Sequence, residues 1–168
     1  MTDSYSLSYS FEQNFDFPAK TAYGWCTDYR PDDHSLMGKK GSRKIRRINE
    51  DTLILTDTYP GLDKPVTKKR LVRLDPGRLS WTNTHISGPN KHSQFWYRIT
   101  GVGKGKSKLE FIGHQVYYCK VPPGKSIEKL ADELKGEDSG MWRLLAAEMR
   151  KDLGQQSHRK HRQGETNG

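Results

Sequence analysis

The sequence predicts an α+β protein in which one long C-terminal helix lies across a curved antiparallel sheet of seven strands. Two observations lead to this prediction. Residues 126–153 repeat apolar side chains at steps of three and four, which places them on one face of a helix. Most of the chain before this segment alternates apolar and polar residues, as half-buried strands do. A helix with one apolar face needs a surface to pack against, and the predicted sheet provides it.

The length and composition favour one domain with an aromatic core. The chain has 168 residues, of which 32% are apolar, and its mean hydropathy is -0.94. Four Trp, eight Tyr and five Phe nevertheless offer large surfaces for burial. We place the domain at residues 1–153. Residues 154–168 contain no apolar side chain, so we expect them to form a disordered basic tail.

Positive charge is the clearest compositional signal. The formal net charge is +9 and the pI is near 9.5. A positive surface attracts RNA, ribosomes, anionic membranes or acidic partners. Lysines also protect exposed strand edges from pairing, so a plain solvated face remains an alternative. The candidate basic surface comprises Lys39, Lys40, Arg43, Lys44, Arg46, Arg47, Lys68, Lys69 and Arg73.

Three features favour a cytoplasmic protein. The N-terminus lacks the basic and apolar regions of a signal peptide. The apolar runs are far shorter than the roughly 20 residues of a membrane span. Cys26 and Cys119 are too few for a disulfide framework or a zinc site, so we expect two reduced thiols, no metal and no cofactor.

The predicted elements follow one another in hairpin order. Residues 5–11 alternate as a first strand, and Pro18 suits the first turn of a short helix that ends before Pro31. Polar turns such as residues 49–51 then join antiparallel neighbours. The remaining strands are expected at residues 42–49, 52–60, 65–75, 78–87, 93–101 and 107–119.

The C-terminal helix has a start signal and two interruptions. Ser126 is a suitable N-cap. Gly136 and Gly140 interrupt the apolar pattern, so we expect the helix to consist of two pieces, the first of which can move as a gate.

Three short motifs within this order of elements resemble the START-like superfamily, also called SRPBCC. They are FDFPA at residues 15–19, CTDY at residues 26–29 and MWRLL at residues 141–145, within a region of similarity from residue 4 to residue 153. The superfamily includes polyketide cyclases, lipid-transfer domains and birch-pollen-type allergens. The resemblance implies the helix-grip fold and a cavity between sheet and helix for a hydrophobic, lipid- or polyketide-like molecule. It implies no catalytic set.

Strand alternation predicts which side chains face this cavity. One register of residues 65–75 turns Arg70 inward, where it pairs with Asp57 or with an acidic group of a ligand, whereas a slip of one residue turns it outward. The polar members of the inward set either bind a ligand or satisfy one another in a filled core. The candidate ligand-binding residues are Asp57, Tyr59, Arg70, Trp81, Asn83, His85, Phe95, Tyr97, Phe111, Gln115, Tyr117, Met141, Trp142, Leu145 and Met149.

Specific chemistry is weakly indicated. His85 with Tyr117 or Asp57 is the acid/base set expected of a cyclase or dehydratase. His34 follows two aspartates, a pattern that suits a solvated turn better than a metal site. We therefore favour a binding or carrier protein over an enzyme, with a basic interaction protein as the other alternative. Trp96 and Tyr118 are predicted to face outward, which leaves monomer and homodimer both open.

Overall fold

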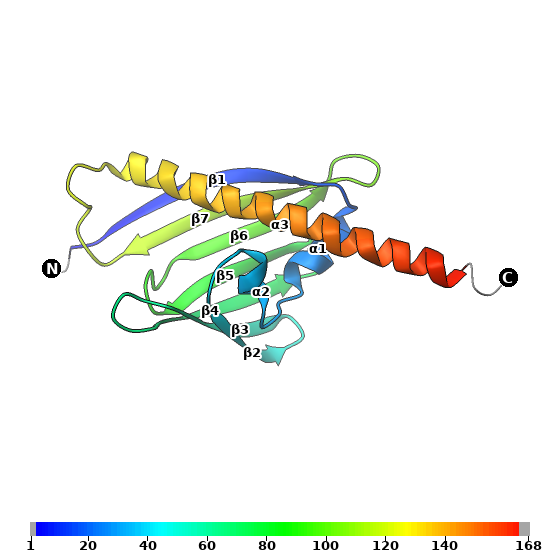
Figure 1. Ribbon diagram of the computed structural model, residues 1–168. Helices are drawn as coiled ribbons and strands as arrows, with labels where there is room; N and C mark the ends of the chain where they lie inside the picture. The colour runs from blue at the N-terminus through cyan, green and yellow to red at the C-terminus, as the bar shows by residue number, and fades with distance from the viewer. Residues whose placement is uncertain (1–2, 165–168) are drawn as a thin grey trace.

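A seven-stranded antiparallel sheet crossed by one long helix makes up the computed structural model, which describes residues 3–164, with side chains through residue 156 (Figure 1). The predicted α+β architecture is confirmed. Within the described residues, no helix is both long and apolar enough to cross a membrane.

The sheet follows the predicted hairpin order. Its strands lie in the order β1-β7-β6-β5-β4-β3-β2, so consecutive strands from β2 to β7 are neighbours and β1 pairs with β7. Leu109, Phe111 and Gln115 of β7 are buried, whereas Glu110 is exposed, as alternation predicted. The strands are β1 (Tyr5–Phe15), β2 (Ser42–Asn49), β3 (Thr52–Tyr59), β4 (Val66–Asp75), β5 (Ser80–Ser87), β6 (Gln94–Gly101) and β7 (Ser107–Tyr117).

Three helices lie on one side of the sheet. Helices α1 (Ala19–Thr27) and α2 (Asp33–Leu36) connect β1 to β2, and α3 (Ile127–Gly164) runs diagonally over the sheet (Figure 1). Ser126 caps α3, because its Oγ accepts a hydrogen bond of 3.1 Å from the Lys129 amide. Trp25 of α1 donates a hydrogen bond of 3.0 Å from Nε1 to Asp152 of α3.

The predicted break in this helix is wrong, since α3 passes through Gly136 and Gly140 without interruption. Each helical glycine costs about 1 kcal/mol relative to alanine. Leu134 on one side of the glycines, and Met141 and Trp142 on the other, pack against the sheet side of the helix. This packing outweighs the local cost.

The helix also continues where a disordered tail was expected from residue 154. It ends at Gly164. Extending an existing helix needs no new nucleation, and Gln155 and Gln156 have good helix propensity. Residues 165–168, the end of the predicted tail, lie outside the described residues.

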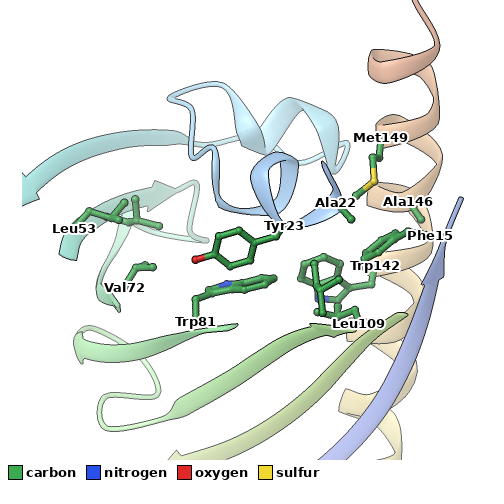
Figure 2. Packing of buried hydrophobic residues seen from close by; sticks show 12 residues of the cluster. Phe15, Ala22, Tyr23, Leu53, Val72, Trp81, Leu109, Trp142, Ala146 and Met149 are labelled. Atoms are coloured by element: carbon green, nitrogen blue, oxygen red, sulfur yellow. The ribbon is translucent and has the colours of Figure 1, made fainter. Parts of the chain in front are cut away.

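Two apolar clusters hold α3 against the sheet. The larger one joins α1 and the later turns of α3 to the strands through Tyr23, Trp81, Trp142 and Met149 (Figure 2). The smaller one lies under the first turns of α3 and contains Leu7, Tyr9, Phe95 and Phe111. Both clusters contain large aromatic side chains, as the composition predicted.

Candidate functional site

A cavity between the sheet and α3 consists of two adjoining chambers. The α1 chamber, of about 170 Å³, is lined by aromatic side chains such as Tyr29, Trp81 and Trp142. Charged side chains, including Asp33, Arg43 and Arg70, also line it. The β7 chamber, of about 230 Å³, lies over the other end of the strands and is more polar. The side chains that line both chambers are Lys39, Tyr59, Arg70, Tyr97 and Met141.

Asp57 on β3 anchors a buried ion-pair network beside the cavity. Arg43 donates hydrogen bonds to Asp57 of 2.7 Å from Nε and 3.3 Å from Nη2, and Arg70 donates one from its own Nη2. Arg43 also donates to Asp33 at 2.7 Å. Burial alone would raise the pKa of Asp57, but the two guanidinium groups outweigh it and hold that pKa below its ordinary value.

His34 belongs to this network, so the predicted solvated turn is wrong. Its ring is buried, its Nε2 lies 3.3 Å from Asp57 Oδ1, and it packs edge-on against Tyr59 with ring centroids 4.8 Å apart. Burial lowers the pKa of His34. Within the described residues, no group of three His, Cys, Asp or Glu side chains is arranged to hold a metal ion.

A second polar network lines the β7 chamber. The Tyr9 hydroxyl donates a hydrogen bond to Asp138 of α3 and accepts one of 2.8 Å from the Gln115 amide. Asn90 and Tyr117 donate to the Gln115 carbonyl oxygen at 3.1 Å and 2.9 Å. Most polar groups at this end therefore satisfy one another, as the filled-core alternative required.

Four buried polar atoms in side chains that line the chambers are exceptions. Within the described residues, Arg70 Nε, Asn83 Oδ1, His85 Nδ1 and Trp142 Nε1 have no hydrogen-bond partner. Asn83 and Trp142 line the α1 chamber, His85 lines the β7 chamber, and Arg70 lines both. A buried polar group without a partner is uncommon in folded proteins and costs free energy. The cavity is therefore lined by side chains that have unused hydrogen-bonding capacity.

Burial also shifts the titrating groups of the β7 chamber. It lowers the pKa of His85 to about 3, with the positive charges of Lys68 and Arg70 acting in the same direction. Burial lowers the pKa of Lys68 and raises the pKa of Asp138, although the hydrogen bond from Tyr9 opposes the latter shift. At neutral pH the chamber thus holds a neutral imidazole.

Thirteen of the fifteen predicted ligand-binding side chains line a chamber. Met149 is instead fully buried in the larger apolar cluster, and Asp57 is enclosed by its ion pairs. The register turns Arg70 inward, where it pairs with Asp57. Of the two predicted acid/base pairs, His85 and Tyr117 share the β7 chamber, whereas Asp57 lines neither chamber. Whether these residues bind a ligand stays a prediction.

The sequence reasoning missed several lining residues. Asp138 is absent from the predicted set, and the predicted basic surface includes Lys39 and Lys68, although both line the β7 chamber. Asp138 lies four residues after Leu134 and three before Met141, so the apolar face of the helix already included it. In β4, Lys68 lies two residues before Arg70 and therefore on the same face of the strand. This spacing predicts that Lys68 faces the cavity.

The candidate basic surface needs correction at two positions. Arg43 is buried in the Asp57 network, because it lies two residues before Ile45 in β2 and therefore on the same, inward-facing side of the strand. Lys68 is partly buried on the cavity side. The other residues of the candidate basic surface that lie in β2 and β4 are exposed. Lys44, Arg46, Lys69 and Arg73 lie on the outer face of the sheet, opposite the cavity.

Comparison with known proteins identifies the fold. No family model matches the sequence, and no curated protein matches it. Among solved structures, the Zhui aromatase/cyclase from a Streptomyces species is 15% identical with a TM-score of 0.62, and the match covers 92% of this chain and 96% of that one. Ara h 8.0201 is 12% identical with a TM-score of 0.66, and the match covers 88% and 99%.

A third similar structure is norcoclaurine synthase from Thalictrum flavum, solved in complex with dopamine and hydroxybenzaldehyde. It is 14% identical with a TM-score of 0.63, and the match covers 88% of each chain. The chain therefore has the helix-grip fold of START-like, Bet v 1-like proteins, as its motifs predicted. Structures with this fold include aromatase/cyclases and Ara h 8.0201.

Proposed function

We propose that this protein binds a hydrophobic small molecule in the cavity between the sheet and α3. The observation that carries this proposal is a set of four buried polar atoms, on Arg70, Asn83, His85 and Trp142, that have no hydrogen-bond partner within the described residues and belong to side chains lining the cavity. Ligand sites usually combine apolar walls with a few polar groups that orient the ligand. The likeness to aromatase/cyclases and to Ara h 8.0201 supports the same class of function.

Fluorescence titration with the uncharged probe N-phenyl-1-naphthylamine tests this proposal. Met141 lines both chambers, so Met141→Trp fills the space where they meet. Leu144→Trp is the matched control, because Leu144 is 55% exposed on the same helix. We expect the wild type and the control to bind the probe, and Met141→Trp to bind it at least about tenfold more weakly. Absence of wild-type binding, or equal binding by Met141→Trp, would reject the proposal.

Acid/base catalysis on the bound molecule is a second candidate function, as in a cyclase or dehydratase. The observation that favours it is the meeting of His85 and Asp138 in the β7 chamber, where burial lowers the pKa of His85 and raises that of Asp138. Native mass spectrometry of gently purified protein would first identify a bound compound. If wild-type protein then converts that compound, loss of conversion in both His85→Ala and Asp138→Asn is expected. Normal conversion by both variants would remove this candidate.

Docking on a polyanion is a third candidate, and the outer face of the sheet favours it. Lys44, Arg46, Lys69 and Arg73 share this face, where their cross-strand partners in β3 are Thr or Ile and no acidic residue. Lysine and arginine contacts to phosphate weaken steeply with added salt. We expect salt-dependent binding of poly(U) RNA or of phosphatidylserine vesicles, lost in Lys69→Ser/Arg73→Ser. Absence of binding to both at low salt would exclude the candidate.

A further inference from the structure

The β7 chamber contains more positive than negative charge. Lys39, Lys68 and Arg70 line it, and Asp138 is the one acidic residue among its described lining residues. The Asp138 carboxylate accepts a hydrogen bond from Tyr9, and the Asp57 carboxylate lies outside the chamber wall. The lining therefore attracts an anion.

Lys68 is a partly buried cation of the β7 chamber. It projects from β4 on the cavity side and is partly buried. Among the described residues it forms no ion pair, and its Nζ lies 6.0 Å from the centre of the Tyr59 ring. Burial lowers the pKa of Lys68, and the nearby Arg70 adds to this effect. Partial burial of an ammonium group that has no carboxylate in an ion pair with it is unfavourable to the fold.

Arg70 adds a second donor at the same place. It lies two residues after Lys68 in β4, so the two side chains stand next to each other on one face of the strand. Its Nη2 is bonded to Asp57, whereas its Nε has no hydrogen-bond partner within the described residues. A guanidinium with a free N–H beside an ammonium group suits a carboxylate.

The apolar part of the cavity indicates the rest of the ligand. Tyr97 stacks on Trp81 with ring centroids 4.6 Å apart and lies 5.8 Å from the Trp142 ring. Tyr97 lines both chambers, whereas the two tryptophans line the α1 chamber. Flat aromatic walls favour a flat ring system.

We infer that the ligand is an aromatic carboxylic acid, with its carboxylate bound by Lys68 and Arg70 in the β7 chamber and its rings in the α1 chamber. This inference rests on the proposed binding function and narrows it to a class of ligand. It assigns Lys68 the role of selecting acids over neutral molecules of the same shape.

Two probes of the same shape test the inference. 2-Naphthoate carries a carboxylate, and 2-naphthylmethanol carries a neutral hydroxymethyl group in its place. Both are titrated by calorimetry against wild type, Lys68→Met and the matched control Lys69→Met, whose exposed side chain lies on the opposite face of β4. We expect wild type to prefer naphthoate about tenfold, because a hydrogen bond between charged groups has roughly that effect. Lys68→Met loses this preference, and Lys69→Met keeps it.

The outcomes separate the inference from the proposed function. Equal affinity of wild type for the two probes, or an equal loss of naphthoate binding in Lys68→Met and Lys69→Met, would overturn the inference while cavity binding stands. Absence of binding by both probes would count against both. The melting temperature of Lys68→Met shows whether it folds. Lys39→Met, at an exposed residue that borders the same chamber, is a second variant in which a smaller loss of naphthoate affinity is expected.

Discussion

Asp57 connects parts of the chain that are distant in sequence. Its carboxylate accepts hydrogen bonds from Arg43 of β2 and Arg70 of β4, and the ring of His34 from α2 lies next to it. The charged groups of Asp57, Arg43 and Arg70 are at least largely buried, so each depends on its partner for compensation. The network therefore fixes the α2 segment against the sheet and holds Arg70 at the cavity wall.

We predict that Asp57→Asn destabilises the protein by about 3–5 kcal/mol, the usual effect of removing one partner of a buried ion pair. The substitution leaves Arg43 and Arg70 buried without their shared carboxylate. Urea denaturation measures the free energy of unfolding. Asp63→Asn, at an exposed residue before β4, is the control and is expected to have little effect. An equally small effect of Asp57→Asn would show that the network adds little to stability.

The lowered pKa of His85 makes the stability of the protein depend on pH. Burial lowers its pKa from 6.5 to about 3, so the unfolded chain takes up a proton at pH values where the folded protein does not. Stability from this group is complete above pH 6.5 and is lost as the pH falls toward about 3. Each unit of pKa difference corresponds to about 1.4 kcal/mol. We expect His85→Phe to be less sensitive to pH in this window when unfolding is followed by circular dichroism.

Other groups modify this pH profile. His34, whose pKa burial also lowers, acts in the same direction as His85, so the slope decreases in His85→Phe without vanishing. Asp138 acts in the opposite direction, because its raised pKa favours the folded state at low pH and the effect is lost as the pH rises. An unchanged slope in His85→Phe would show that His85 is not held neutral by the fold.

The long helix shows how packing overrides a local signal. Gly136 and Gly140 lie within a continuous α3, and a Cβ at Gly136 would contact nothing within 4 Å. Neither glycine has a positive φ. The glycines therefore weaken the helix without any steric need for them.

We predict that Gly136→Ala stabilises the protein by about 1 kcal/mol, because alanine loses less backbone freedom on folding. Gly113→Ala is the contrasting variant. A Cβ at Gly113 would lie 2.9 Å from Tyr9 Cζ, so this change should be destabilising. Thermal unfolding of both variants is the measurement. A loss of stability in Gly136→Ala would indicate that the helix needs its flexibility at this point, as the gate hypothesis supposed.

At the scale of the whole molecule, periodic sequence patterns predicted the strand faces well, but they did not predict contacts between segments that are distant in sequence. Alternation placed Trp81, Phe95 and Phe111 on the cavity side, because a strand turns each second residue to the same face. The same rule, applied fully to β4, would have placed Lys68 there too. No local pattern predicts that His34, in the α2 segment, reaches Asp57, since only the tertiary fold brings these residues together.

The cavity itself reflects a compromise between folding and binding. Asn83 is 2% exposed, and its Oδ1 has no partner within the described residues. Lys68 likewise places a charge on the cavity wall without an ion pair among those residues. Such groups lower the stability of the empty protein, and sites that bind ligands often do so.

We therefore predict opposite effects of Asn83→Leu on stability and on binding. Removing an unsatisfied buried amide should raise the free energy of unfolding by about 1 kcal/mol. The same change removes a polar group from the α1 chamber and should weaken binding of 2-naphthoate. Thr82→Val, next in sequence but on the outer face of β5, is the control for both measurements. If Asn83→Leu instead lost stability and kept its affinity, the amide would be a structural group of the fold, and the main observation behind the binding function would be weakened.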